Sequence, residues 1–386
     1  MKDTAIVGKP VEIGLRLIDS WPGASNRIGR LTVWSLMMAA LIFQYWDAVS
    51  VFNDLDNLMD NFSVTITETL FFVKLIIVYK NRRYVNEVLK HMSEDWNSVK
   101  SVEEWTVMTE HAKLSRIFYI WALGLYVGTV VLFLPVVINH YNAADINDRK
   151  FVLPSEYPFQ SKVSPVYEVL CCVQFLQAVL TAAGNALTES LLVTLVLHAG
   201  SRLVLLRKDI SRFSDISRTV DDRRKILLAG NVLVANHRRV IEFSDKIEDL
   251  FSYISLVQVL SSTLIICTIG FMFITSISST KNILTLMKFG LFILGELWET
   301  LAYCLAGEYL SNQSQSISQA VYECPWYKMQ PRDSKMLMMI MIRAQKPLRI
   351  TAGKFIFLSL DNFTDRYEGN LGIQADSQRA RGLMEL

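Results

Sequence analysis

Apolar stretches long enough to cross a membrane recur along this chain. Three of them contain no charged residue: Ile117–Ile138, Val169–Thr188 and Phe251–Thr280. About 20 apolar residues in a helix cover the hydrocarbon core of a bilayer. Backbone amides in lipid must be satisfied within their own segment, which favours helices over strands. Three weaker stretches share this pattern: Leu31–Phe52, Phe62–Tyr79 and Leu284–Leu305. The pattern therefore predicts a helical membrane protein with at least six spans.

The charge of the segments between these stretches predicts their orientation. Five Lys and Arg residues precede position 31, seven lie in 80–116 and eleven in 201–247. The intervening segment 53–61 has none, and 139–164 has three. Lys and Arg concentrate in cytosolic loops. We therefore expect a cytosolic N-terminus, the inverse of the orientation of G-protein-coupled receptors.

Composition excludes several classes of protein. The chain has 386 residues, is 51% hydrophobic and carries a formal net charge of +2, which gives no support for nucleic-acid binding. Residues 1–27 lack the apolar core of a cleavable signal peptide. The five cysteines show no CxxC spacing and none falls in an expected external loop, so neither a disulfide nor a metal site is expected. No cofactor is expected either.

Two regions on the cytosolic side break the simple pattern of spans and loops. Apolar residues continue at helical spacing through 190–250, which predicts that the fourth and fifth helices extend beyond the bilayer as a paired stalk. The run Met336–Ile342 is too short to span and predicts a cytosolic helix packed on that stalk. The run Phe355–Leu360 indicates the start of a seventh helix that does not continue.

Candidate chemistry is sparse. No HExxH, GxSxG or Walker motif occurs, and no enzyme is expected. The absence of catalytic residues and internal repeats also argues against a transporter or lipid enzyme. Ionisable residues within spans are functional candidates. For Glu68 the favoured interpretation is hydration at the membrane interface, and for Glu296 and Glu299 it is pairing with basic stalk residues.

The external halves of the second, third, fourth and sixth helices share an apolar, aromatic character with a few hydroxyl and thiol groups. A pocket with such a lining suits a small, mostly apolar ligand, although ordinary helix packing explains any one of these residues equally well. The candidate ligand-binding residues are Thr65, Thr69, Phe133, Val137, Tyr167, Cys171, Phe175, Phe289 and Phe292.

Three stretches together resemble the insect odorant receptor family. They are HRRVIEFSDKIEDLFSYISLVQVLSSTLIIC from His237 to Cys267, YCLAGEYLSNQSQSISQAVYECPWY from Tyr303 to Tyr327, and IRAQKPLRITAGKFIFLSL from Ile342 to Leu360. The external Tyr157-Pro158-Phe159 adds to the match. The second and third stretches argue against a gustatory-type chemoreceptor, which is the nearest alternative.

The resemblance implies an all-α, seven-transmembrane-type bundle with a cytosolic N-terminus, acting as a receptor in olfaction at the plasma membrane of sensory neuron dendrites. It implies an odorant-binding subunit of a heteromeric ligand-gated cation channel. Its partners would be a small volatile odorant, the bilayer, and an odorant receptor co-receptor in a hetero-tetramer. The co-receptor has a much longer insertion between helices four and five. Odorant pockets in the family lie among helices two, three, four and six.

The end of the chain departs from the family pattern. After Phe363 the family continues into an apolar pore helix, whereas residues 361–386 here carry eight charges. We expect this final helix to be missing, which keeps a non-conducting, truncated isoform as an alternative. The expected regions are a cytosolic segment 1–30, helices one to six in 31–305 with extensions at about 190–250, a cytosolic region 306–360 that ends in the start of helix seven, and a hydrophilic tail 361–386.

Overall fold

A computed structural model describes residues 9–17, 21, 27–99, 101–132, 149, 151–278 and 283–365. The helices are α1 (Lys9–Leu17), α2 (Arg27–Ser50), α3 (Leu55–Lys80), α4 (Arg82–Ser98), α5 (Val102–Leu132), α7 (Val166–Thr219), α8 (Arg223–Ser278), α9 (Ile283–Glu323) and α10 (Pro331–Ala344). A 3-10 turn, η3 (Trp326–Lys328), and two short strands, β1 (Thr351–Ala352) and β2 (Ile356–Phe357), complete the described elements.

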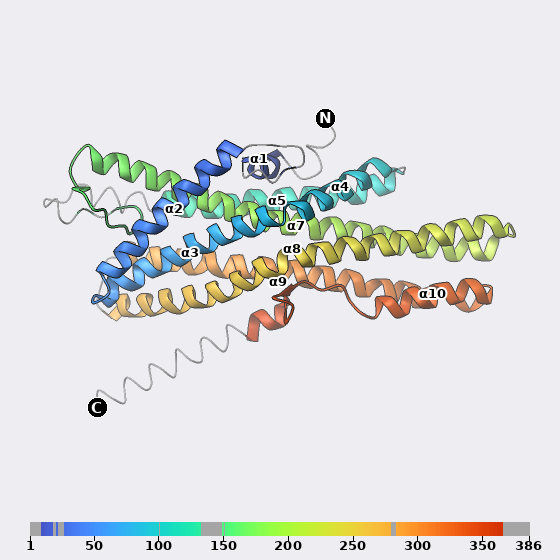
Figure 1. Cartoon of the computed structure of the whole chain (residues 1–386). Helices are drawn as coiled ribbons and strands as arrows, with labels where there is room; N and C mark the ends of the chain where they lie inside the picture. The colour runs from blue at the N-terminus through green and yellow to red at the C-terminus, as the bar shows by residue number, and fades with distance from the viewer. Residues whose placement is uncertain are drawn as a thin grey trace, which may run out of the picture.

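Six of these helices are long and apolar enough to cross a membrane: α2, α3, α5, α7, α8 and α9. They coincide with the six stretches predicted from the sequence, which confirms the helical membrane fold. They form an elongated bundle in which α7 packs against α5, α8 and α9 (Figure 1). The central position of α7 agrees with the burial of Leu191, Leu192 and Leu195.

The two ends of the bundle differ in a way that matches the inverted orientation. The α2–α3 turn, the beginning of α7, the end of α8 and the beginning of α9 lie at one end, on the left of Figure 1. The α7–α8 turn and α10 lie at the other end, on the right. The segments at the right-hand end are those rich in Lys and Arg, so this end is cytosolic.

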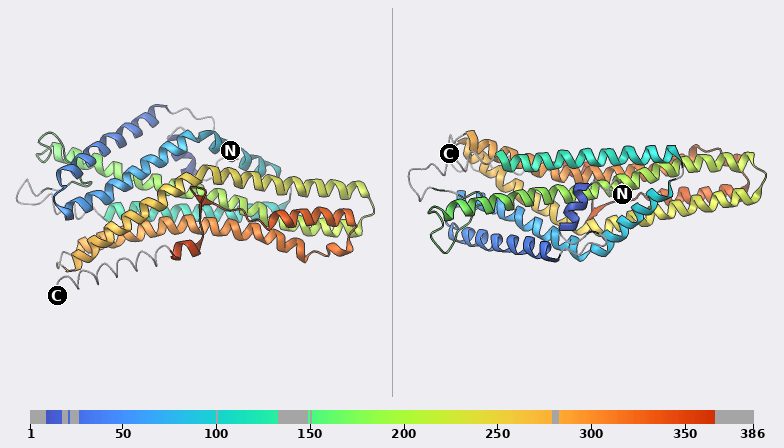
Figure 2. Two further views of the ribbon diagram at one scale, coloured as in Figure 1. Left: turned by 60° about the horizontal axis from the view of Figure 1, so that its bottom comes forward. Right: turned by 90° about the horizontal axis from the view of Figure 1, so that it is seen from above.

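α7 and α8 are far longer than a bilayer requires. They contain 54 and 56 residues, or roughly 80 Å each at 1.5 Å per residue, against a hydrocarbon core of about 30 Å. Figure 2 shows from two further directions that they run side by side to the cytosolic end, beside α10. The main apolar core continues there between the helices, through Phe213 of α7, Phe243 of α8 and Leu337 of α10.

The region after α10 differs from the sequence-based expectation. Ile356 and Phe357 form a strand paired antiparallel with β1, and a short helix occupies 360–365, so the helix begins later than position 355. The reason is the turn between the strands, where Gly353 and Lys354 both have φ near +66° to +69°, a left-handed conformation that ends a helix. The turn is fixed to α8, because the Gly353 N–H donates to the Ser252 carbonyl at 2.9 Å.

Candidate functional site

A cavity of about 180 Å³ lies in the external half of the bundle. Its walls come from α3, α5, α7, α8 and α9, and the external segment around Val152, Leu153 and Pro154 closes one side. The remaining lining residues are Asp60, Ser63, Val64, Thr67, Glu68, Tyr126, Thr129, Val130, Ala178, Thr181, Ala182, Asn185, Ile269, Phe289, Leu291, Phe292, Gly295, Glu296 and Glu299.

One apolar wall of the cavity is built by α9, together with Ile269 of α8. Ile269 is 2% exposed and packs in one cluster with the 5% exposed Phe289, while Phe292 packs against that cluster. Burying apolar surface is worth about 25 cal/mol per Å², so a ligand that covers these side chains gains affinity without directional bonds. This wall therefore suits a small, largely apolar molecule.

The external segment is held over the cavity by α7. The backbone N–H of Leu153 donates to Gln174 Oε1 at 3.1 Å, and Gln174 Nε2 donates to the Tyr157 hydroxyl at 3.0 Å. The Tyr157 ring in turn packs against the rings of Phe43, Phe151 and Phe159, with ring centroids 4.7 Å to 5.5 Å apart. One glutamine on α7 thus fixes the position of the segment that covers the site.

Glu68 of α3 lines the cavity and contacts α7 directly. Its side chain is 3% exposed and its Oε2 accepts hydrogen bonds from Thr181 at 2.9 Å and from Gln177 at 3.2 Å. The hydrated, interfacial position expected from the sequence is therefore wrong. Glu68 lies about one and a half turns inside the start of the predicted span, on the helix face that packs against α7, which removes it from water.

A buried ion pair lies at the inner end of the cavity. The Lys74 ammonium, 0% exposed, contacts the Glu299 carboxylate and donates to Asn185 Oδ1 at 3.0 Å. Next to it, Glu296 Oε2 accepts a hydrogen bond from Ser262 at 3.0 Å. The sequence-based expectation that Glu296 and Glu299 pair with stalk residues is wrong, because α3 brings Lys74 against α9 within the membrane.

Two sequence-predicted site residues, Phe289 and Phe292, line the cavity. Thr65 and Thr69 instead face other partners: Thr65 Oγ1 donates to Asn61 at 2.9 Å, and Thr69 lies 3.0 Å from the Tyr45 hydroxyl of α2. The predicted residues Phe133 and Val137 lie outside the described residues.

The predicted residues of α7 lie nearer its external end than the cavity lining does. Tyr167 is 1% exposed and packs on Phe151 at 5.3 Å, and Cys171 and Phe175 are partly buried. By helical spacing Cys171 and Phe175 share a face with the lining residue Ala178, one to two turns further out. These three residues border the site rather than line it.

Sequence reasoning missed the polar face of α7. Ala178, Thr181, Ala182 and Asn185 follow the 3- and 4-residue spacing of one helix face. Small and polar side chains at that spacing within an apolar span indicate a close approach or a cavity. That signal was present in the sequence and would have predicted this wall.

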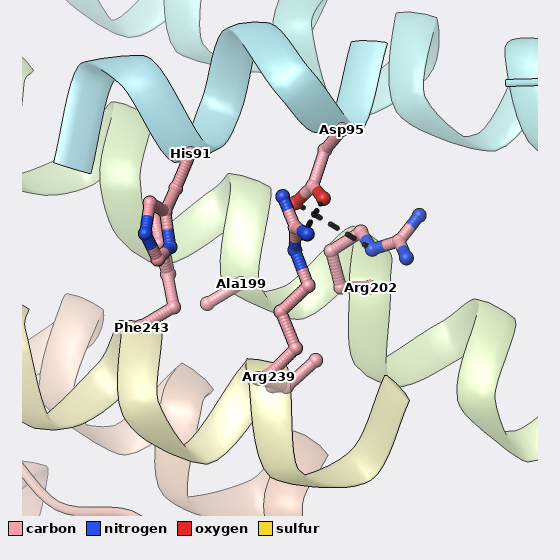
Figure 3. A pocket seen from close by; sticks show the side chains of 7 residues that line it. His91, Asp95, Ala199, Arg202, Arg239 and Phe243 are labelled. Atoms are coloured by element: carbon pink, nitrogen blue, oxygen red, sulfur yellow. Dashed lines mark ion pairs between the residues drawn. The ribbon is translucent and has the colours of Figure 1, made fainter. Parts of the chain in front are cut away.

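A second polar cluster lies on the cytosolic side. Figure 3 shows the Asp95 carboxylate of α4 between Arg202 of α7 and Arg239 of α8, at 3.7 Å and 2.9 Å. His198 also donates to Asp95, at 3.0 Å. The space beside this cluster measures about 10 Å³, room for about one water molecule, so the cluster joins three helices rather than binding a ligand.

The cluster also sets the protonation of its acid. Burial by itself would raise the pKa of Asp95, but the hydrogen bond from His198 and the charges of Arg202 and Arg239 outweigh it. The pKa of Asp95 therefore lies below its usual value. The carboxylate is negative at neutral pH and can hold both arginines.

This chain is similar to known odorant receptors in sequence. The family model described as 7tm Odorant receptor matches residues 54–366. Odorant receptor 13a of Drosophila melanogaster is 25% identical over 91% of this chain and 90% of its own length. Odorant receptor 10 of Aedes albopictus is 22% identical over 75% of this chain and 76% of its own.

A solved structure has the same fold. The olfactory receptor OR5 from Machilis hrabei in complex with eugenol superimposes with a TM-score of 0.80 at 14% identity, over 96% of this chain and 98% of that one. At this identity the likeness concerns the fold.

Proposed function

This chain belongs to the insect odorant receptor family, so it is a multi-pass plasma-membrane receptor of olfaction and not an enzyme, and we propose that the cavity described above binds its odorant. The observation that carries this proposal is the position and lining of the cavity. It is enclosed by membrane helices in the external half, it is mostly apolar, and Phe289 and Phe292 line it.

The subunit type is the second part of the proposal. We propose that this chain is the ligand-tuning subunit of a cation channel and assembles with the co-receptor as a hetero-tetramer. Three residues separate Thr219, the last of α7, from Arg223, the first of α8. This short connection supports a tuning subunit, because the co-receptor is distinguished by a long insertion at that position.

We further propose the regional division expected from the sequence. Segments 1–30 and 306–360 would lie in the cytosol, and 31–305 would hold the six spans with their cytosolic extensions. The cytosolic assignment of 306–360 is supported by α10, whose Asp333 accepts from Arg223 of α8 at 2.7 Å. The tail 361–386 lies outside the described residues from position 366 onward.

Truncation of the aromatic wall tests the site. We expect Phe289→Ala and Phe292→Ala to change the rank order of odorant potencies, because each removes apolar contact from one side of the cavity; buried Phe to Ala changes cost about 3–5 kcal/mol of packing in cores. The readout is odorant-evoked current in cells that express the co-receptor with a version of this chain carrying an apolar, family-type helix after Phe363, because the hydrophilic tail 361–386 is expected to supply no pore helix.

Phe62→Ala is the matched control. Phe62 lies on α3, is 46% exposed and does not line the cavity. Surface labelling checks that all three variants reach the plasma membrane. An unchanged rank order in both cavity variants, with normal surface levels, would place the odorant site elsewhere.

A further inference from the structure

We infer that this cavity selects odorants that carry a basic amine, with Glu68 as the residue that receives the ammonium group. The inference rests on the proposed function, since it names the ligand class of the same cavity. It follows from the imbalance of charge around the cavity, from the hydrogen bonds that its carboxyl groups make, and from its size.

The lining is acidic without a matching base. Asp60, Glu68, Glu296 and Glu299 line the cavity, and no Lys or Arg of the described chain does so. Lys74 lies just behind the wall, and its ammonium is already occupied by Glu299 and Asn185. A carboxyl group removed from water keeps its charge only beside a cation or several donors and otherwise binds a proton, which a basic amine entering the cavity can accept to form an ammonium–carboxylate pair.

Glu68 is the acid best placed to take a cation from a ligand. Its hydrogen-bond donors, Thr181 and Gln177, are both neutral, and both reach Oε2. Within the described part of the chain its Oε1 accepts no hydrogen bond, although the side chain is 3% exposed and lines the cavity. Glu296 shows the same arrangement, with Ser262 bonded to its Oε2.

The rest of the cavity suits an organic ammonium rather than a metal ion. Phe289 and Phe292 form an apolar, aromatic part of the lining, and aromatic faces also attract cations. A cavity of about 150 Å³ lined by apolar side chains binds benzene, so about 180 Å³ holds a single ring with a short amine arm. The ring would be buried against α9 and the ammonium would meet Glu68 on α3.

Three probes of nearly equal shape separate the contributions of charge, hydrogen bonding and apolar contact to binding. Benzylamine carries an ammonium at neutral pH, benzyl alcohol a neutral donor, and toluene neither. The full chain is purified into lipid nanodiscs, and the rise of its thermal midpoint with probe concentration gives an apparent Kd, independently of channel current. We expect benzylamine to bind most tightly, benzyl alcohol next and toluene least.

Glu68→Gln is the decisive variant. The amide oxygen of Gln can still accept from Thr181 and Gln177, so the wall keeps its bonds while the charge disappears. We expect benzylamine to weaken roughly tenfold to a hundredfold, the range of a charge-assisted hydrogen bond, and toluene to change less than about twofold. Glu156→Gln, an exposed acid on the external segment that does not line the cavity, should leave all three affinities unchanged.

The outcomes separate this inference from the proposed function. The amine inference is overturned if benzylamine and toluene bind equally, or if Glu68→Gln leaves the benzylamine affinity intact. In either case, an effect of Phe289→Ala on toluene binding would still support the odorant cavity. No stabilisation by any probe, with no effect of Phe289→Ala, overturns both. If Glu68→Gln does not fold, the inference requires that the unmodified chain bind benzylamine more tightly than toluene and that Glu296→Gln keep this preference; loss of the preference in Glu296→Gln would overturn the assignment to Glu68.

Discussion

Removing Lys74 should be among the most damaging single changes within the membrane. Lys74→Met leaves the Glu299 carboxylate buried without its cation, near Glu189 and Glu296. Two unit charges about 4 Å apart interact by roughly 4 kcal/mol at an effective dielectric of 20, and breaking a buried pair costs about 3–5 kcal/mol in measured cases. At about 2 °C per kcal/mol for large domains, the thermal midpoint should fall by roughly 6–10 °C.

Adding Glu299→Gln to Lys74→Met distinguishes loss of the ion pair from a general disruption of helix packing. The double variant Lys74→Met/Glu299→Gln removes both charges, so it should recover more than half of the loss seen with Lys74→Met alone. The midpoint is measured as the temperature at which half of the nanodisc-embedded protein remains monodisperse after heating. Additive losses in the double variant would refute the reasoning, because they would show that the two charges do not stabilise each other.

Three other predictions concern orientation, the cytosolic cluster and close packing. A tag at the N-terminus should be labelled by antibody only after cells are permeabilised; labelling of intact cells would contradict the inverted orientation. Asp95→Asn should cost about 1–3 kcal/mol at neutral pH, less than a fully buried pair because Arg239 is partly exposed. The pKa of Asp95 in the folded protein lies below its unfolded value of about 3.9. Ionised Asp95 therefore contributes its full stabilisation above that pH, and the stabilisation disappears as the pH falls through the folded pKa. The unfolding curves of the variant and the parent should therefore converge in acid. Gly307→Ala should destabilise the protein by about 1–3 kcal/mol, because its Cβ would meet the backbone of Leu358, whereas Gly290→Ala, with nothing within 4 Å, should be neutral or stabilising in the same thermal assay.

The membrane helices could be predicted from the sequence because each depends on local information. The run Val169–Thr188, for example, carries its own length and apolar character, and both are visible without knowing its neighbours. The charge rule likewise needs nothing beyond residue counts between spans. The six spans and their orientation therefore follow from the amino-acid sequence alone.

The pairing of polar residues at the cavity could not be predicted from local sequence in the same way. Lys74 and Glu299 are separated by 225 positions, and which helix faces which depends on packing of the whole bundle. Stalk residues are the partners that the sequence favours for Glu299, because they are basic and numerous, but the long Lys74 side chain of α3 reaches Glu299 of α9 within the membrane. The hairpin at 351–357 was missed for another reason: its turn depends on left-handed φ at Lys354, which a lysine rarely adopts.

The unbroken length of α8 has a mechanical consequence. Ile269, at the cavity, and Arg239, in the cytosolic cluster, belong to the same uninterrupted helix, 30 residues or about 45 Å apart. No loop between them can absorb a movement, so the helix acts as a lever. A tilt of roughly 1° about one end displaces the other end of a rod some 80 Å long by about 1.4 Å. A ligand that tilts α8 by this angle from the cavity therefore moves the cytosolic end of the helix by about 1.4 Å, a distance large enough to rearrange side-chain packing there.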